Sequence, residues 1–149
     1  MALYAAARRS ITPATTTDNW TLTAGASKSG RIVEFSWGGE QTTTTAVASR
    51  VARSDSQTGN TTSVTNAKLH PNSPASGMVV ASSFATTQPT LNTGDLFATS
   101  WNAHGGVVRW LAAPEERMVL IGAATEINIS QRNTVTSGVH SYSVVWEED

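Results

Sequence analysis

Histidine is the residue type in this chain best suited to binding a metal or moving a proton. The three histidines, His70, His104 and His140, are widely separated in the sequence. No HxH or HExxH spacing occurs, so no short segment brings two of them together as ready-made ligands. We therefore expect three ordinary loop or surface histidines, with no metal and no cofactor.

Nucleophiles and paired carboxylates give no stronger signal for catalysis. With 17 serines in the chain a Ser-His-Asp triple can always be named, but no G-x-S-x-G elbow occurs. A glycosidase needs two carboxyl groups facing each other across a cleft. Glu34 and Glu40 are separated by a Gly-Gly break, and the adjacent Glu115 and Glu116 follow Pro114 in an expected turn. We expect a protein that is not an enzyme, and keep a small hydrolase as an alternative.

Five tryptophans offer a different kind of site. Trp37, Trp101, Trp110 and Trp146 lie in strand-like patterns, and Trp20 stands near the start of the chain. Exposed tryptophans in a row would stack on sugar rings, which makes a carbohydrate-binding β-sandwich module an alternative. Their fit to alternating apolar faces instead favours positions in the core or at subunit contacts.

The amino-acid composition indicates which type of secondary structure positions these candidate residues. The 149 residues are a one-domain length, so we treat 1–149 as a single β-sandwich domain. Thr (22), Val (13) and Ile (5) greatly outnumber Leu (7) and Lys (2), and charged residues are only 14%. Because β-branched residues favour strands and Lys and Leu favour helices, this composition predicts an all-β domain.

Short apolar runs broken by turn residues predict the individual strands. Val33, Phe35 and Trp37 alternate on one face, as do Tyr142, Val144 and Trp146 at the other end of the chain. The runs 96–101 and 107–113 are expected to pair as a hairpin around the loop 102–106. A turn is expected at 92–95. Eight to ten strands at this spacing predict an antiparallel β-sandwich of jelly-roll type.

Charge and hydropathy argue against several classes of partner. The net charge is −1 and the pI about 6.3, so no broad basic field would attract nucleic acid. No apolar run of membrane-spanning length occurs, and we expect no membrane partner. The first residues lack the basic region that precedes the apolar run of a signal peptide. Cysteine is absent, which excludes disulfides and thiol chemistry.

Two segments look suited to contact a partner. Residues 1–13 are small and apolar apart from Arg8 and Arg9, and we expect either an N-terminal arm or an edge strand there. The segment 68–74 reads KLHPNSP, and its two prolines predict an ordered loop or an edge. Such a loop would lose little conformational entropy on docking.

Four stretches resemble small structural proteins of tailed bacteriophages. They read TTTTAVASRVAR (42–53), KLHPNSP (68–74), GVVRWLAAP (106–114) with Ile121-Gly122, and SVVWEE (143–148). The resemblance implies a structural virion protein, of the capsid cement or decoration type, that is made in the host cytoplasm. It further implies that this protein binds the major capsid protein on the capsid surface and associates with itself, as a homotrimer. A phage tail, neck or fibre component is the nearest alternative.

The stretches that carry the resemblance contain no reactive residue. The expected contact residues therefore come from the segments 1–13 and 68–74. We expect contacts with the capsid or with other subunits from Leu3, Tyr4, Arg8 and Arg9, and from Lys68, His70, Pro71 and Pro74.

Overall fold

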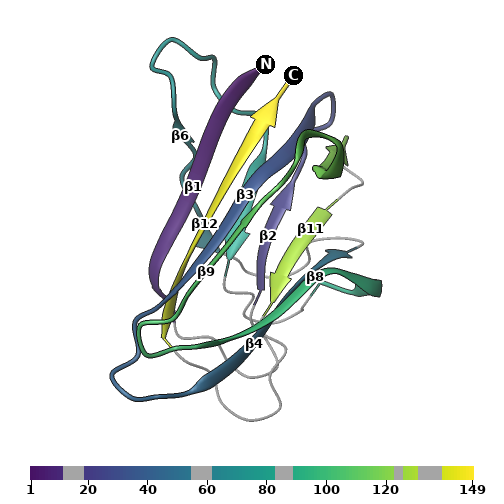
Figure 1. The fold of residues 1–149 in the computed structure, drawn as a ribbon. Helices are drawn as coiled ribbons and strands as arrows, with labels where there is room; N and C mark the ends of the chain where they lie inside the picture. The colour runs from purple at the N-terminus through teal and green to yellow at the C-terminus, as the bar shows by residue number, and fades with distance from the viewer. Residues whose placement is uncertain (12–18, 55–61, 83–88, 123–125, 131–138) are drawn as a thin grey trace.

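Alternating apolar residues build two packed β-sheets in the computed structural model, which describes residues 1–11, 19–54, 62–82, 89–122, 126–130 and 139–149 (Figure 1). Sheet A contains β1 (Ala2–Ile11), β3 (Ser29–Gly39), β6 (Ala67–Lys68), β9 (Val107–Leu111), β10 (Met118–Ile121) and β12 (His140–Glu148). Sheet B contains β2 (Asn19–Thr23), β4 (Ala46–Ser54), β5 (Thr62–Ser63), β7 (Val79–Ser82), β8 (Leu91–Asn102) and β11 (Glu126–Ser130). All their pairings are antiparallel.

The strand order is that of a jelly roll. In sheet A it runs β10-β3-β12-β1-β6, with β9 beside β10 on the same side of β3, and in sheet B it runs β5-β7-β2-β11-β4-β8. The chain crosses repeatedly between the sheets, and the late strands β11 and β12 insert between early ones, β2 and β4 in one sheet and β1 and β3 in the other. Two interlocked Greek keys of this kind define the fold. The predicted all-β, jelly-roll sandwich is therefore confirmed.

Helical structure is confined to one short element among the described residues, the 3-10 helix η1 (Pro114–Glu116) that joins β9 to β10. The described part of the chain contains no helix long and apolar enough to cross a membrane.

Strand β12 shows how sequence alternation becomes a core. His140, Tyr142, Val144, Trp146 and Glu148 are buried, and the residues between them are partly exposed. The prediction that Tyr142, Val144 and Trp146 share one face is confirmed. This face meets aromatic rings from both sheets: Tyr142 stacks on Trp20 of β2 at 6.0 Å, and Trp146 stacks on Tyr4 of β1 at 5.9 Å.

A β-bulge in β3 corrects the prediction for Val33. On the β12 side, Val145 pairs with Glu34 and Trp146 pairs with Ile32, so Val33 is an extra residue. Such a bulge reverses the alternation at one point. Phe35 and Trp37 are buried as predicted, but Ile32 takes the inward position and Val33 is only partly buried.

The predicted hairpin of 96–101 with 107–113 is wrong. Strand β8 pairs with β4 in sheet B, while β9 pairs with β3 in sheet A. The connecting loop crosses between the sheets, held by hydrogen bonds from the Ala103 amide to the Thr45 carbonyl (2.8 Å) and from the Gly39 amide to the Gly106 carbonyl (2.8 Å). A short glycine-rich loop thus marks a reversal of the chain, without saying which strands pair.

The turn expected at 92–95 is a bulged part of β8. The β4–β8 register shifts between Val51 and Ala52 and again between Ala52 and Ser54, and Gly94 has a φ of 100°. Glycine adopts this conformation without the steric cost that a side chain would impose. The turn-forming residues therefore kink a strand that continues through them.

Candidate contact surface

The two segments expected to make contacts lie side by side. In β1, Tyr4 pairs with Lys68 of β6 and Ala5 pairs with Ala67. The Leu69 amide extends this pairing by donating a hydrogen bond to the Leu3 carbonyl at 3.1 Å. Residues 2–11 are thus a strand of sheet A, paired along β12 on one side and bordered on the other by the two-residue β6. The structure has no free arm there, while residues 12 and 13 lie outside the described part of the chain.

Exposed apolar side chains gather where β1 meets β6. Leu3 is 40% exposed and Leu69 54% exposed, and Met1 is largely exposed. The register places Leu69 opposite Leu3, so both side chains project from the same face of sheet A. We call this group the terminal surface and define it as Met1, Leu3, Lys68, Leu69, His70 and Pro71, of which the polar Lys68 and His70 flank Leu69 in the sequence.

Local hydrogen bonds shape the proline loop that continues from this surface. The Ser73 amide donates to the His70 carbonyl at 3.0 Å, and the Asn72 amide donates to the His70 Nδ1 at 3.3 Å. Pro71 and Pro74 restrict the backbone on either side of Asn72 and Ser73. His70 therefore stabilises the loop by accepting hydrogen bonds at its carbonyl and its Nδ1, and its ring is exposed.

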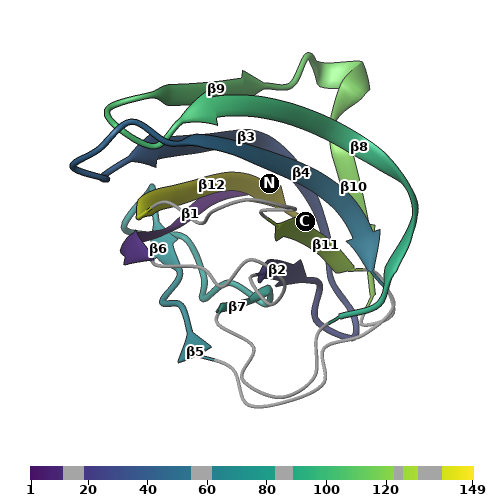
Figure 2. The same cartoon turned by 90° about the horizontal axis from the view of Figure 1, so that it is seen from below.

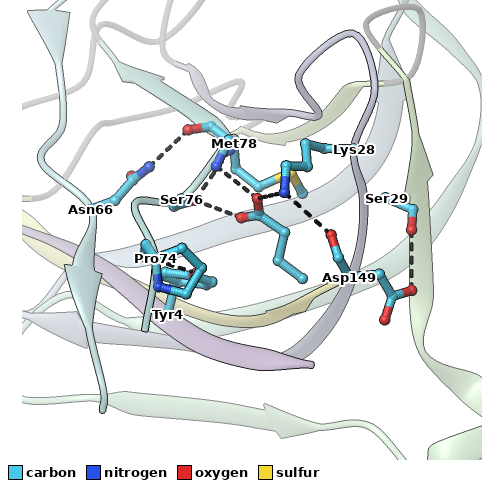
Figure 3. Close-up of polar contacts among 10 residues, drawn as sticks. Tyr4, Lys28, Ser29, Asn66, Pro74, Ser76, Met78 and Asp149 are labelled. Carbon is cyan, nitrogen blue, oxygen red and sulfur yellow. Dashed lines mark hydrogen bonds and ion pairs between the residues drawn. The ribbon is translucent and has the colours of Figure 1, made fainter. Parts of the chain in front are cut away.

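A buried carboxylate fastens the far end of the same loop to the body of the protein. Glu148, near the end of β12, accepts hydrogen bonds from the Gly77 amide at 2.7 Å and from the Ser76 hydroxyl at 2.8 Å. The Lys28 Nζ lies 3.7 Å from the same carboxylate and donates a hydrogen bond to the Asp149 carbonyl at 3.4 Å (Figure 3). We call this group the Glu148 clasp, made of Glu148, Ser76, Gly77 and Lys28.

Tyr4, expected to be a contact residue, supports the loop from beneath. It is 1% exposed, stacks on Trp146 and donates its hydroxyl hydrogen bond to the Pro74 carbonyl at 3.1 Å (Figure 3). Burial, followed by the charge of Glu148, raises the pKa of the Tyr4 phenol above its ordinary value of 10.0. The hydroxyl thus stays protonated at neutral pH and keeps donating to the loop.

A hollow of about 430 Å³ lies between the strand ends and the proline loop. Tyr4, His70, Pro74, Lys28 and Glu148 are among the residues that line it. Glu148 and Lys28 are already engaged in the clasp, and Tyr4 is bonded to the loop. These three lining side chains therefore already have partners within the protein.

Arg8 and Arg9 do not belong to the terminal surface, although the sequence grouped them with Leu3. They stand near the other end of β1, and at about 3.3 Å per residue they lie roughly 17–20 Å from Leu3. Arg8 hydrogen-bonds to the Ser82 hydroxyl of sheet B. The Arg9 side chain is 86% exposed and lies 3.8 Å from Glu40.

Two of the three histidines are exposed, as the sequence predicted, and the third is not. His70 and His104 are exposed, but His140 is fully buried and packs edge-on against Tyr142, with ring centroids 4.3 Å apart. His140 belongs to the inward-facing set of β12, so its strand position explains the burial. Within the residues that the structure describes, no group of three His, Asp or Glu side chains could hold a metal ion.

Most carboxylates on the outer face of sheet A are engaged in ion pairs within the chain. Arg109 of β9 binds Glu34 of β3 through two hydrogen bonds of 2.7 and 2.9 Å. Arg117 binds Glu147, and Arg31 lies 3.8 Å from Asp149. This arrangement neutralises charge on the face and leaves no pair of free carboxylates across a cleft there.

The Glu34–Arg109 pair predicts a pH-dependent contribution to stability. The hydrogen bond from Arg109, aided by its charge, lowers the pKa of Glu34 below its ordinary value of 4.5, against the opposing effect of partial burial. The contribution is therefore present above pH 4.5 and is lost as the pH falls through the lowered pKa. Urea unfolding should show wild type more stable than Glu34→Gln near neutral pH, with the difference vanishing in strong acid. Glu115→Gln, on exposed η1, is the control; a Glu34→Gln deficit that persists in acid would contradict the assignment.

The tryptophans form a core and no sugar-binding platform. Trp20, Trp37, Trp101 and Trp146 are buried, and Trp110 is partly buried and packs against Phe35 and Phe97. The prediction of core positions is confirmed, and the exposed tryptophan row that a sugar-binding module would require is not formed.

Sequence reasoning missed Met1 and Leu69 as members of the surface. The sequence did contain a signal for Leu69, which lies between Lys68 and His70 in a proline-containing segment. Because no apolar residues alternate with it, the segment has no apolar face that would pack into a core. The Glu148 clasp was also missed, since a terminal acidic residue normally suggests solvent exposure.

Comparison with protein-family models, with curated proteins and with solved structures finds no match for this chain.

Proposed function

We propose that this chain is a structural virion protein of the capsid cement or decoration type, which packs its terminal surface against the major capsid protein on the outside of the head. The observation that carries the proposal is the pairing of β1 with β6. It joins the two expected contact segments into one surface and leaves Leu3 and Leu69 exposed on it.

The composition of the terminal surface suits protein contact. Apolar side chains surrounded by a polar border are typical of interfaces, where the centre is desolvated and the border stays wet. The clasp and the Tyr4–Pro74 hydrogen bond hold the proline loop in place before any partner arrives. Docking would then lose little conformational entropy, which favours affinity.

The fold is shared by proteins of several different functions. Jelly rolls occur in viral capsid proteins and also in lectins and cupins, so the function depends on the site that the fold carries. The buried tryptophans weigh against sugar binding, and the engaged carboxylates weigh against hydrolysis. The described residues thus favour a surface that binds another protein.

Co-sedimentation with phage heads tests the proposal. The purified protein should pellet with empty expanded shells that lack it, and should raise the temperature at which those shells break open. Because the surface is apolar at its centre, binding should persist at high salt. Isolated tails are the matched control. Binding to tails and not to shells would replace the capsid role with the tail alternative, and binding to neither would refute a virion role.

A further inference from the structure

Sheet edges are natural templates for pairing with another chain, and most edges of this protein are protected. β5 and β6 are two residues long, and β8 is kinked by two register shifts around Gly94. Beside β10, the Arg53 guanidinium from sheet B donates to the Val119 carbonyl at 3.0 Å. Shortness, bulges and side-chain caps are the usual devices that prevent edge-to-edge association.

Strand β9 has none of these devices. Its five residues pair with β3 without a register shift. The flanking Gly106 carbonyl and Ala112 amide bond to β3, so by alternation the N–H and C=O groups of Val107, Arg109 and Leu111 point away from it. In the described part of the chain these outward groups have no hydrogen-bond partner.

The side chains of the same three residues also suit pairing. Val107 is 76% exposed and Leu111 61% exposed. A charged residue between them would ordinarily discourage association, but both hydrogen bonds from Arg109 draw its guanidinium over β3 to Glu34. The charge is thus neutralised and held away from the free edge.

We propose that β9 pairs with β9 of a second copy of this chain, antiparallel and about a two-fold axis at Arg109. The order apolar, arginine, apolar reads the same in both directions, so Val107 of each copy meets Leu111 of the other. The three outward residues of each strand would supply six hydrogen bonds between the copies. A contact of this kind uses the same surface on both partners, so assembly stops at two chains, in place of the three that the resemblance implies.

The consequence for assembly rests on the proposed function. β9 and β6 lie at opposite edges of sheet A (Figure 2), so the pair would carry its two terminal surfaces at its two outer ends. Two linked contacts bind more tightly than either alone when the geometry permits both. The pair would therefore be suited to bridging two capsid subunits.

Light scattering coupled to size exclusion tests the pairing without any capsid. Wild type should have twice the 15.7 kDa mass of one chain. Val107→Lys and Leu111→Glu should each give monomers, because each places a charge against an apolar side chain. The double variant should restore the dimer, since Lys at 107 would then face Glu at 111 of the other copy. Circular dichroism should show the same folded β spectrum for all four proteins.

A single cysteine provides a second readout of the register, in a chain that has none of its own. Paired residues of this type have Cα atoms about 5.5 Å apart, within the range that a disulfide spans. Arg109→Cys should therefore cross-link to a dimer on mild oxidation, while Leu96→Cys on the bulged β8 should not. A wild-type monomer, a trimer, or a dimer that survives Val107→Lys would each overturn the inference, whether or not the protein binds capsids.

Discussion

Replacing Trp146 by alanine should lower the free energy of unfolding by about 3–5 kcal/mol. The Trp146 side chain is fully buried in β12, between Tyr4 of β1 and Ile32 of β3. Its loss removes a large apolar area and the stacking on Tyr4, and the two neighbouring strands cannot close the gap without breaking their pairing. Since a domain is stable by only about 5–15 kcal/mol, the variant should be near the limit of folding.

Urea unfolding followed by tryptophan fluorescence measures this loss, with Trp110→Ala as the matched control. Trp110 is partly buried at the edge strand β9, so its removal should cost clearly less. Equal losses for the two variants would contradict the assignment of Trp146 to the centre of the core.

Replacing Glu148 by alanine should lower the free energy of unfolding by about 2–4 kcal/mol and loosen the proline loop. Hydrogen bonds to charged groups contribute about 1.5–3 kcal/mol each, and Glu148 accepts from both the Gly77 amide and the Ser76 hydroxyl. Without the carboxylate the Gly77 amide would lose its partner. Glu148→Gln keeps one acceptor oxygen, so it should fall between wild type and alanine.

Hydrogen exchange at the Gly77 and Met78 amides reports on the loop directly, because the Met78 amide donates to Ser76 inside the clasp. Both amides should exchange faster in Glu148→Ala. Asp149→Ala is the control, since that carboxylate is about half exposed and contributes little. Unchanged exchange at Gly77 in Glu148→Ala would show that the clasp does not hold the loop.

The sequence was sufficient to predict the class of fold because strand patterns are local. Alternation in 142–146 depends only on which residues are apolar, and β12 has it. Pairing is not local, and the separation of β8 from β9 follows from hydrogen bonds to Thr45 and Gly39, far away in the sequence. The bulge at Val33 likewise depends on the register with β12, which no property of β3 alone determines.

The two segments of the contact surface could be predicted from the sequence, but which of their residues are exposed could be predicted only in part. Proline spacing identified the loop, and small apolar residues identified β1. Whether a β1 residue faces inward or outward depends on sheet pairing, which is why Tyr4 is buried beside an exposed Leu3. Arg8 and Arg9 were grouped with Leu3 by sequence proximity, although an extended strand carries them to its other end.

A pair of matched leucine variants tests most directly whether the terminal surface binds the capsid. Leu3 lies on that surface and is 40% exposed, while Leu96 lies on sheet B and is 44% exposed. Leu3→Asp should weaken binding to empty shells at least about tenfold, because burying a leucine contributes about 1.5–3 kcal/mol and 1.4 kcal/mol is tenfold. Leu96→Asp should bind as wild type does. If both variants bind normally, or Leu96→Asp alone loses binding, the terminal surface is not where this protein meets the capsid.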